Sequence, residues 1–159
     1  MEEVYPGRHV VRAVGGVVDC AMPTFSHTSA ARLATCHPDL EALFNRVIQT
    51  HDVTILCGAR GKAEQDEAVR TGHSKTPWPT SNHNADGVKR KTSWAVDVAP
   101  YPVDWKDTAR FQALSVVVLD IAAKMLAAGE MKHAIRWGGT FKGFPDMPHY
   151  ELVGVAEGE

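Results

Sequence analysis

A run of apolar residues between Phe111 and Leu126 repeats at helical spacing and stops before Gly129. Apolar side chains at this spacing form one continuous stripe along a helix, and such a stripe must be buried against other elements. The pattern therefore predicts a long core helix. The residues that make the stripe are Phe111, Leu114, Val117, Val118, Ile121, Ala122, Met125 and Leu126.

Shorter elements precede and follow this helix. Helical patterns run from Pro38, which suits a first helical turn, to about Thr50, and from Ala63 to Thr71, where Gly72 stops the helix. A long polar loop is expected over residues 73–92. Helices and strands thus alternate irregularly, which favours an α+β fold with a small antiparallel sheet flanked by helices. The strand candidates are 53–57, 94–98, 134–137 and 150–153.

Composition limits the domain organisation and the partners. A chain of 159 residues with 44% hydrophobic and 23% charged residues should form one domain. We expect residues 1–26 to be an extension, ordered or a short hairpin, and residues 27–159 to form the folded domain. The net charge of -2 gives no general attraction to nucleic acid or to an anionic membrane.

The cysteines and the N-terminal residues indicate the cellular compartment in which the protein is made. The cysteines at 20, 36 and 57 are odd in number and widely spaced, which favours reduced thiols over a disulfide framework or a structural zinc site. The chain opens with acidic residues and contains no apolar run long enough to span a bilayer. We therefore expect synthesis in the cytoplasm without a signal peptide, and no membrane insertion.

Two histidines and two aspartates carry the chemistry that the sequence indicates. His83, Asp97 and His149 provide two imidazoles and one carboxylate, the donor set of a hydrolytic Zn²⁺ centre that keeps its fourth position for water. Asp146 lies three residues before His149, so one short turn could hold a metal ligand and a general base. The arrangement predicts metal-assisted hydrolysis.

At this point the chain resembles a known family: the zinc peptidases that include D-alanyl-D-alanine carboxypeptidases and the L-alanyl-D-glutamate endopeptidases of bacteriophage lysins. The resemblance spans about Phe25 to Leu152, and the ordered set of segments makes it specific. It implies a hedgehog/DD-peptidase-like zinc peptidase fold for residues 27–159. The segments that carry it are Ser29 to Leu40, Cys57 to Gly61 with Gln65, Gly72 to Lys75, Ser81 to Asn84, Ala95 to Tyr101, Arg136 to Gly139 and Asp146 to Leu152.

Position by position, the resemblance implies that the two histidines and Asp97 bind zinc and that Asp146 is the catalytic base and acid. Arg60 would bind and orient the substrate, since a guanidinium pairs bidentately with a carboxylate or polarises a carbonyl. Gln65 and Ser81 are weaker candidates for the substrate-binding shell. The segment between His83 and Asp97 is longer than is usual in the family, and we expect it to loop out without disturbing either ligand.

Simpler interpretations stay open for several of these residues. Asp146 could start a turn before Pro148. Arg60 could pair only with a nearby acid such as Glu64 or Asp66. Glu151 could support a histidine ligand or lie on a strand surface. The other six histidines are expected to be ordinary core or surface residues.

The resemblance implies zinc-dependent hydrolysis of a peptide bond in the peptidoglycan stem, of the L-alanyl-D-glutamate type found in phage endolysins. Two alternatives remain: a D-alanyl-D-alanine carboxypeptidase, and a catalytically silent wall-binding or phage structural module on the same fold. We expect a monomer that reaches the cell wall after release by a holin, with the stem peptide as its partner and no nucleic acid.

Overall fold

The computed structural model describes residues 22–154. Most of the predicted extension therefore lies outside the described residues, and residues 22–26 contain neither helix nor strand. No helix of the described part combines the length and the apolar character needed to cross a bilayer. The helices are α1 (His27–Leu33), α2 (Pro38–Val47), α3 (Lys62–Arg70), α4 (Thr108–Ala127) and the short 3₁₀ helix η1 (Gly138–Thr140), and the strands are β1 (Val53–Cys57), β2 (Ala95–Pro100), β3 (Ala134–Trp137) and β4 (His149–Val153).

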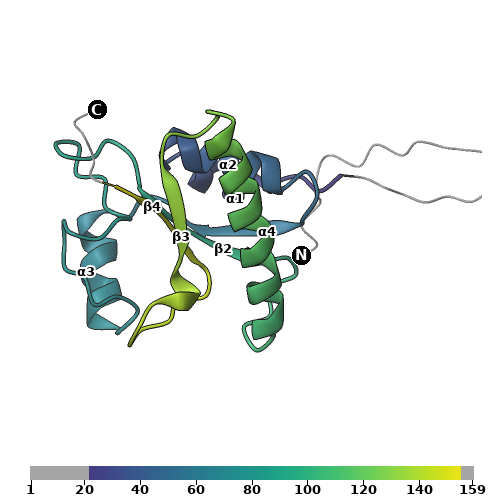
Figure 1. Ribbon diagram of the computed structural model, residues 1–159. Coiled ribbons are helices and arrows are strands. Elements are labelled where there is room, and N and C mark those ends of the chain that lie inside the picture. The colour runs from purple at the N-terminus through teal and green to yellow at the C-terminus, as the bar shows by residue number, and fades with distance from the viewer. Residues whose placement is uncertain (1–21, 155–159) are drawn as a thin grey trace, which may run out of the picture.

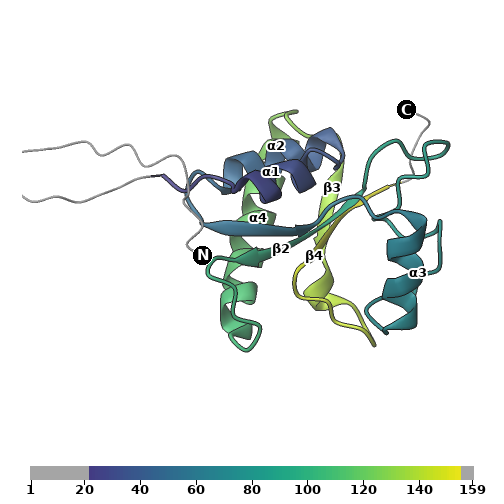
Figure 2. The same ribbon diagram turned by 180° about the vertical axis from the view of Figure 1, so that it is seen from behind.

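The strands form one antiparallel sheet in the order β1-β2-β4-β3. Successive residues of a strand point to opposite faces, so each strand contributes to a core face and to a second face. Helices α2 and α4 pack on the core side, whereas α3 stands apart from the other helices (Figures 1 and 2). The core face carries Ile55, Val96, Val98, Trp137, Tyr150 and Leu152.

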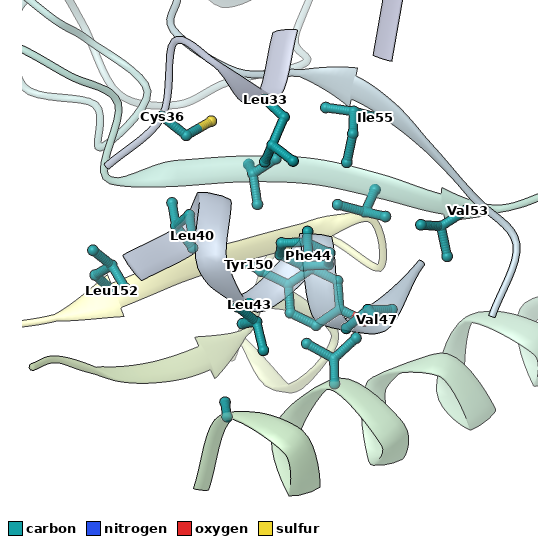
Figure 3. Packing of buried hydrophobic residues seen from close by; sticks show 14 of the residues in the cluster. Leu33, Cys36, Leu40, Leu43, Phe44, Val47, Val53, Ile55, Tyr150 and Leu152 are labelled. Atoms are coloured by element: carbon teal, nitrogen blue, oxygen red, sulfur yellow. The ribbon is translucent and has the colours of Figure 1, made fainter. Parts of the chain in front are cut away.

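Phe44 of α2 and Tyr150 of β4 lie at the centre of this core. Both side chains are almost fully buried, and their rings meet edge to face with centroids 5.6 Å apart (Figure 3). Aromatic pairs in this orientation add stabilisation beyond the area that they bury. The contact joins the helical layer to the strand that carries His149.

Helix α1 covers the free edge of β1. Ser26 caps the helix by accepting a hydrogen bond from the Ser29 amide at 3.1 Å. The Ser29 hydroxyl then accepts from the Ile55 amide at 3.1 Å, and Arg32 donates to the Ile55 carbonyl at 3.0 Å. An edge strand with unpaired backbone groups invites pairing with another chain. Here two side chains of α1 occupy those groups.

The predicted elements agree with the structure in most places. Strands β1 and β3 have the predicted bounds, and residues 73–92 contain no helix and no named strand. Helix α2 ends three residues before Thr50. Helix α1 was not predicted, because Leu33 is its only buried apolar residue and its docking on β1 is polar.

We predict that Phe44→Ala lowers the free energy of unfolding by about 3–5 kcal/mol, because it removes a buried ring and leaves a cavity. Urea denaturation followed by circular dichroism measures the change. Val116→Ala on the exposed side of α4, where the side chain is 69% exposed, is the control and should change stability by less than about 0.5 kcal/mol. Equal losses in the two variants would contradict the assignment of Phe44 to the core.

Candidate active site and metal centre

The register of the sheet brings the candidate residues together on the face opposite the core. Asp97 of β2 is directly opposite His149 of β4 and also pairs with Cys57 of β1 across a bulge. Directly opposite residues of antiparallel strands project their side chains to the same face. Because their neighbours Val96, Val98 and Tyr150 point into the core, Asp97 and His149 must point away from it.

His83 reaches the same face from the long loop. Its backbone carbonyl accepts from the Arg60 amide at 2.8 Å, and its Nδ1 lies 2.8 Å from the Gly58 carbonyl oxygen, to which it donates. Gly58 has no room for a side chain, since an added Cβ would lie 2.2 Å from the Arg32 carbonyl oxygen. The contact fixes the tautomer of His83 and leaves the lone pair of Nε2 aimed at Asp97.

Three donor atoms converge on one point. His83 Nε2 lies 3.2 Å from Asp97 Oδ1 and 3.2 Å from His149 Nδ1, and His149 Nδ1 lies 3.1 Å from Asp97 Oδ1. A tetrahedral zinc ion about 2.0–2.1 Å from each ligand separates its ligand atoms by about 3.3 Å. The donor types and their spacing therefore fit Zn²⁺ with a fourth position open to the cleft.

Glu151 fixes the second imidazole. His149 Nε2 lies 2.8 Å from Glu151 Oε2, so this nitrogen donates to the carboxylate and Nδ1 is free to bind a metal. Asn82 donates to the same oxygen at 2.8 Å, and Arg136 pairs with the other oxygen of Glu151. A carboxylate behind a histidine ligand orients the ring and raises its basicity. Glu151 therefore orients the ring of a candidate ligand, His149, and does not lie on an exposed strand surface.

The charges of the cluster are strongly coupled. Burial disfavours the charged form of His83, but the Asp97 carboxylate outweighs this effect and raises the pKa of His83 to about 10. Burial would raise the pKa of Asp97, yet His83 and His149 hold that pKa well below its usual range. Burial likewise opposes ionisation of Glu151, and hydrogen bonds from His149 and Asn82 lower its pKa to about 2. The cluster therefore stabilises a cation at its centre.

Asp146 lies beside the cluster without belonging to its triangle. A carboxylate oxygen of Asp146 and the donor atoms of Asp97 and His149 all lie within 4.8 Å of one another. The Asp146 amide donates to the Gly138 carbonyl at 2.9 Å, and a Cβ on Gly138 would meet the Asp146 carbonyl oxygen at 2.5 Å. The glycine thus permits the close approach that positions this aspartate.

The Asp146 carboxylate has no hydrogen bond or ion pair with any described residue. Burial, followed by the charge of Asp97, raises its pKa above the usual aspartate value. A half-buried, unpaired carboxylate with a raised pKa in a cleft is typical of a general base or acid. Asp146 does also start a turn, since its carbonyl accepts from the His149 amide at 3.2 Å, but its carboxylate takes no part in that turn.

Arg60 contacts the cluster and not the acids of the following helix, α3. Its Nη2 lies 3.7 Å from Asp97 Oδ2, and its Nη1 donates to Gln65 Oε1 at 3.0 Å. Glu64 instead caps the Gly61 amide, and Asp66 pairs with Lys62. The guanidinium is therefore held next to the candidate metal ligands.

The two weaker candidates lie near Arg60 in different environments. Gln65 is fully buried behind the cleft wall, and its side-chain amide is saturated by contacts with Arg60, Asn84, Ser74 and Thr76. Ser81 lines the cleft, and its hydroxyl accepts from the His83 amide at 3.3 Å. Their predicted roles in substrate binding stay predictions.

The long segment between His83 and Asp97 closes on itself. Asp86 Oδ1 accepts from the amides of Val88, Lys89 and Arg90, and Gly87 turns the chain with φ +74°. The two flanking donor atoms remain 3.2 Å apart. The extra residues therefore displace neither candidate ligand.

Sequence reasoning missed several residues that the fold brings to the site. The Cys57 sulfur lies within 4.8 Å of the donor atoms of His83 and Asp97, although no motif links it to them. Asn84 is buried and joins the Arg60 carbonyl to Gln65. Only the position of Asn84 directly after His83 could have pointed to it.

A second group of possible ligands, His37, Asp39 and His133, lies elsewhere in the described part of the chain. Its donor atoms serve local structure. Asp39 Oδ2 accepts from the amides of Lys132 and His133 and lies 2.9 Å from His133 Nδ1, while His37 Nδ1 accepts from the Asp39 amide at 3.1 Å. This group fits a metal ion less well than the cluster on the open face.

The cluster lies in a cleft of about 1030 Å³. Arg60, Ser81, His83, Asp97, Asp146 and His149 all line it. The cleft also carries aromatic side chains and further cations, including Trp105, Phe144 and Lys75. It is thus large enough to admit a peptide next to the candidate metal ligands.

Comparisons with known proteins agree with this geometry. A family model described as phage L-alanyl-D-glutamate peptidase matches residues 22–154. A crystal structure of the Serratia marcescens L-Ala D-Glu endopeptidase ChiX is similar with a TM-score of 0.66 and 26% sequence identity, covering 86% of this chain and 96% of that chain. The expected α+β fold and the suspected family are confirmed. The chain belongs to the phage L-alanyl-D-glutamate peptidase family.

Proposed function

We propose that this protein is a zinc-dependent endopeptidase that hydrolyses the bond between L-alanine and D-glutamate in the peptidoglycan stem peptide. The observation that carries the zinc proposal is the convergence of His83 Nε2, Asp97 Oδ1 and His149 Nδ1 at 3.1–3.2 Å beside an unpaired Asp146. Membership of the family supports the bond and the peptidase activity. It also favours cleavage within the stem over removal of a terminal D-alanine.

The proposed roles follow from the positions of the side chains. His83, Asp97 and His149 would hold Zn²⁺, which when bound supplies a Lewis acid and lowers the pKa of a coordinated water. Asp146 would accept a proton from the attacking water and return it to the leaving amine. Arg60, held against Asp97, would orient the carbonyl group of the substrate. Every one of these groups comes from a single chain, which supports action as a monomer.

As in a phage endolysin, the site of action would be the bacterial cell wall, reached after a holin has opened the way from the cytoplasm. The partner would be the stem peptide, with no role for nucleic acid. Neither insertion into a membrane nor a second chain is needed to complete the site.

Digestion of purified peptidoglycan tests the activity. Mass spectrometry of the products should reveal new amino termini on glutamate, intact glycan strands and no release of terminal D-alanine. A casein-like protein should stay uncut. New reducing ends would instead indicate a glycosidase, and the absence of any product from zinc-loaded protein on several wall types would support a silent binding module.

We predict one zinc ion per chain and an affinity that depends on Glu151. Glu151→Ala should weaken zinc binding by about 10–100-fold, because the His149 ring loses the carboxylate that orients it. Competition with a chromophoric chelator measures the affinity, and elemental analysis measures the stoichiometry. Glu130→Ala, at an exposed pair with Arg46, is the matched control and should bind zinc like the parent. Full zinc occupancy in a His149→Ala variant would rule out the proposed ligand set.

We predict that Asp146→Asn keeps its zinc and its fold but loses about 10²–10⁴-fold in turnover, as expected when a positioned general base is removed. Steady-state cleavage of a defined stem peptide gives the rate, and zinc content is measured on the same preparation. Asp120→Asn, on the exposed side of α4, should retain full activity. Loss of zinc from the Asp146 variant would make this residue a ligand and refute its assignment as the base.

A further inference from the structure

Two of the four lysine and arginine side chains that line the cleft already have a carboxylate partner. Arg60 lies against Asp97, and Arg136 pairs with Glu151. Two lysines that line the cleft, Lys75 and Lys142, form no ion pair with any described residue. Positive charge is thus available in the cleft beyond what the metal cluster and its supports use.

Lys75 is on a segment that the buried amide of Gln65 holds in place. Gln65 Nε2 donates to Ser74 Oγ at 3.0 Å and to the Thr76 carbonyl at 2.5 Å. The other end of the same amide accepts from Arg60 Nη1. The Gln65 side chain therefore holds both neighbours of Lys75 and also holds Arg60. Because of this shared partner, Lys75 and Arg60 have fixed positions relative to each other along one wall of the cleft.

The ammonium group of Lys75 points across to the loop that carries Asp146. Its Nζ lies 4.9 Å from the centroid of the Phe144 ring, two residues before Asp146. A cation on an aromatic ring at an exposed site is held only weakly. An anionic group of a ligand can therefore replace or share this contact.

Glutamate in a linear peptide supplies such an anion. It uses its amino group and one of its two carboxyl groups in the chain, so the second carboxyl stays free within one residue of the bond that is cut. We propose that Lys75 binds this free carboxylate and makes the enzyme prefer substrates in which it is not amidated. The proposal rests on the proposed L-alanyl-D-glutamate activity, and it identifies the free carboxylate of glutamate as the substrate group that Lys75 recognises.

Lys75 suits this role better than its neighbours. The guanidinium of Arg60 is divided between Asp97 and Gln65, which commits it to the metal side of the cleft. Lys142 precedes Gly143, which has φ +79°, and its ammonium contacts no described group. A charge that is already positioned loses less conformational entropy on binding than one on a free side chain.

The test uses two synthetic stem peptides that differ only in this carboxyl group, one free and one converted to the carboxamide. The parent enzyme should cleave the free acid with a kcat/KM roughly tenfold higher or more, since a hydrogen bond between charged groups is lost in the amide. Lys75→Met should reduce the ratio of the two kcat/KM values to about one, because it should slow cleavage of the free-acid peptide alone. Lys75→Arg should retain much of it.

Lys142→Met and Lys124→Met are the matched controls, on the cleft rim and on the far helix α4, and both should keep the preference of the parent. Zinc content and thermal unfolding of each variant establish that the site and the fold are intact. Equal cleavage of the two peptides by the parent, equal slowing of both by Lys75→Met, or loss of the preference in Lys142→Met would each overturn the proposal while leaving the peptidase activity in place. Failure to cut either peptide between alanine and glutamate would instead refute the proposed function itself, and this proposal with it.

Discussion

Asp97 and His149 are directly opposite each other on β2 and β4, and the other parts of the cleft are arranged around that pair. A shift of either strand by one residue would turn its own side chain, Asp97 or His149, into the core and bring Val96 or Tyr150 to the open face. The aromatic contact between Phe44 and Tyr150 therefore does more than stabilise the domain. It secures the alternation that leaves two candidate metal ligands on the open face.

Buried lone pairs explain why the cluster needs a cation. Two imidazole nitrogens and a carboxylate oxygen within 3.2 Å of one another repel unless a positive charge lies between them. A proton can take this role as well as a metal ion, since the Asp97 carboxylate raises the pKa of His83 to about 10. A metal ion has to displace that proton, so binding must weaken as the pH falls. The same convergence that favours zinc thus makes its affinity depend on pH.

The sequence was informative where local pattern or ligand chemistry carried the signal. The apolar stripe of α4 identified a core helix, and short apolar runs identified the strands β1 and β3. The fold also brings His83, Asp97, Asp146 and His149 together, as their chemistry suggested. Residues whose role depends on distant partners were harder to assign. Asn82 and Glu151 are 69 residues apart, and only the folded sheet joins them. Helix α1 was missed for a related reason, because its docking uses Ser29 and Arg32 on the backbone of a strand that follows later.

The close approach of Gly138 to Asp146 divides the loop between them into fixed ends and a less constrained middle. The ends of the loop are fixed, since the Gly138 carbonyl accepts from the Asp146 amide and the Asp146 carbonyl accepts from the His149 amide. The middle of the loop, residues 141–145, is held by the Phe141 amide, by ring contacts of Phe141 with His149 and Arg136, and by the contact of Phe144 with Lys75. Substitutions at Phe144 can therefore reshape the cleft without moving the Asp146 carboxylate. Such a loop lets an enzyme lineage adapt to new wall chemistries while its hydrolytic centre stays the same.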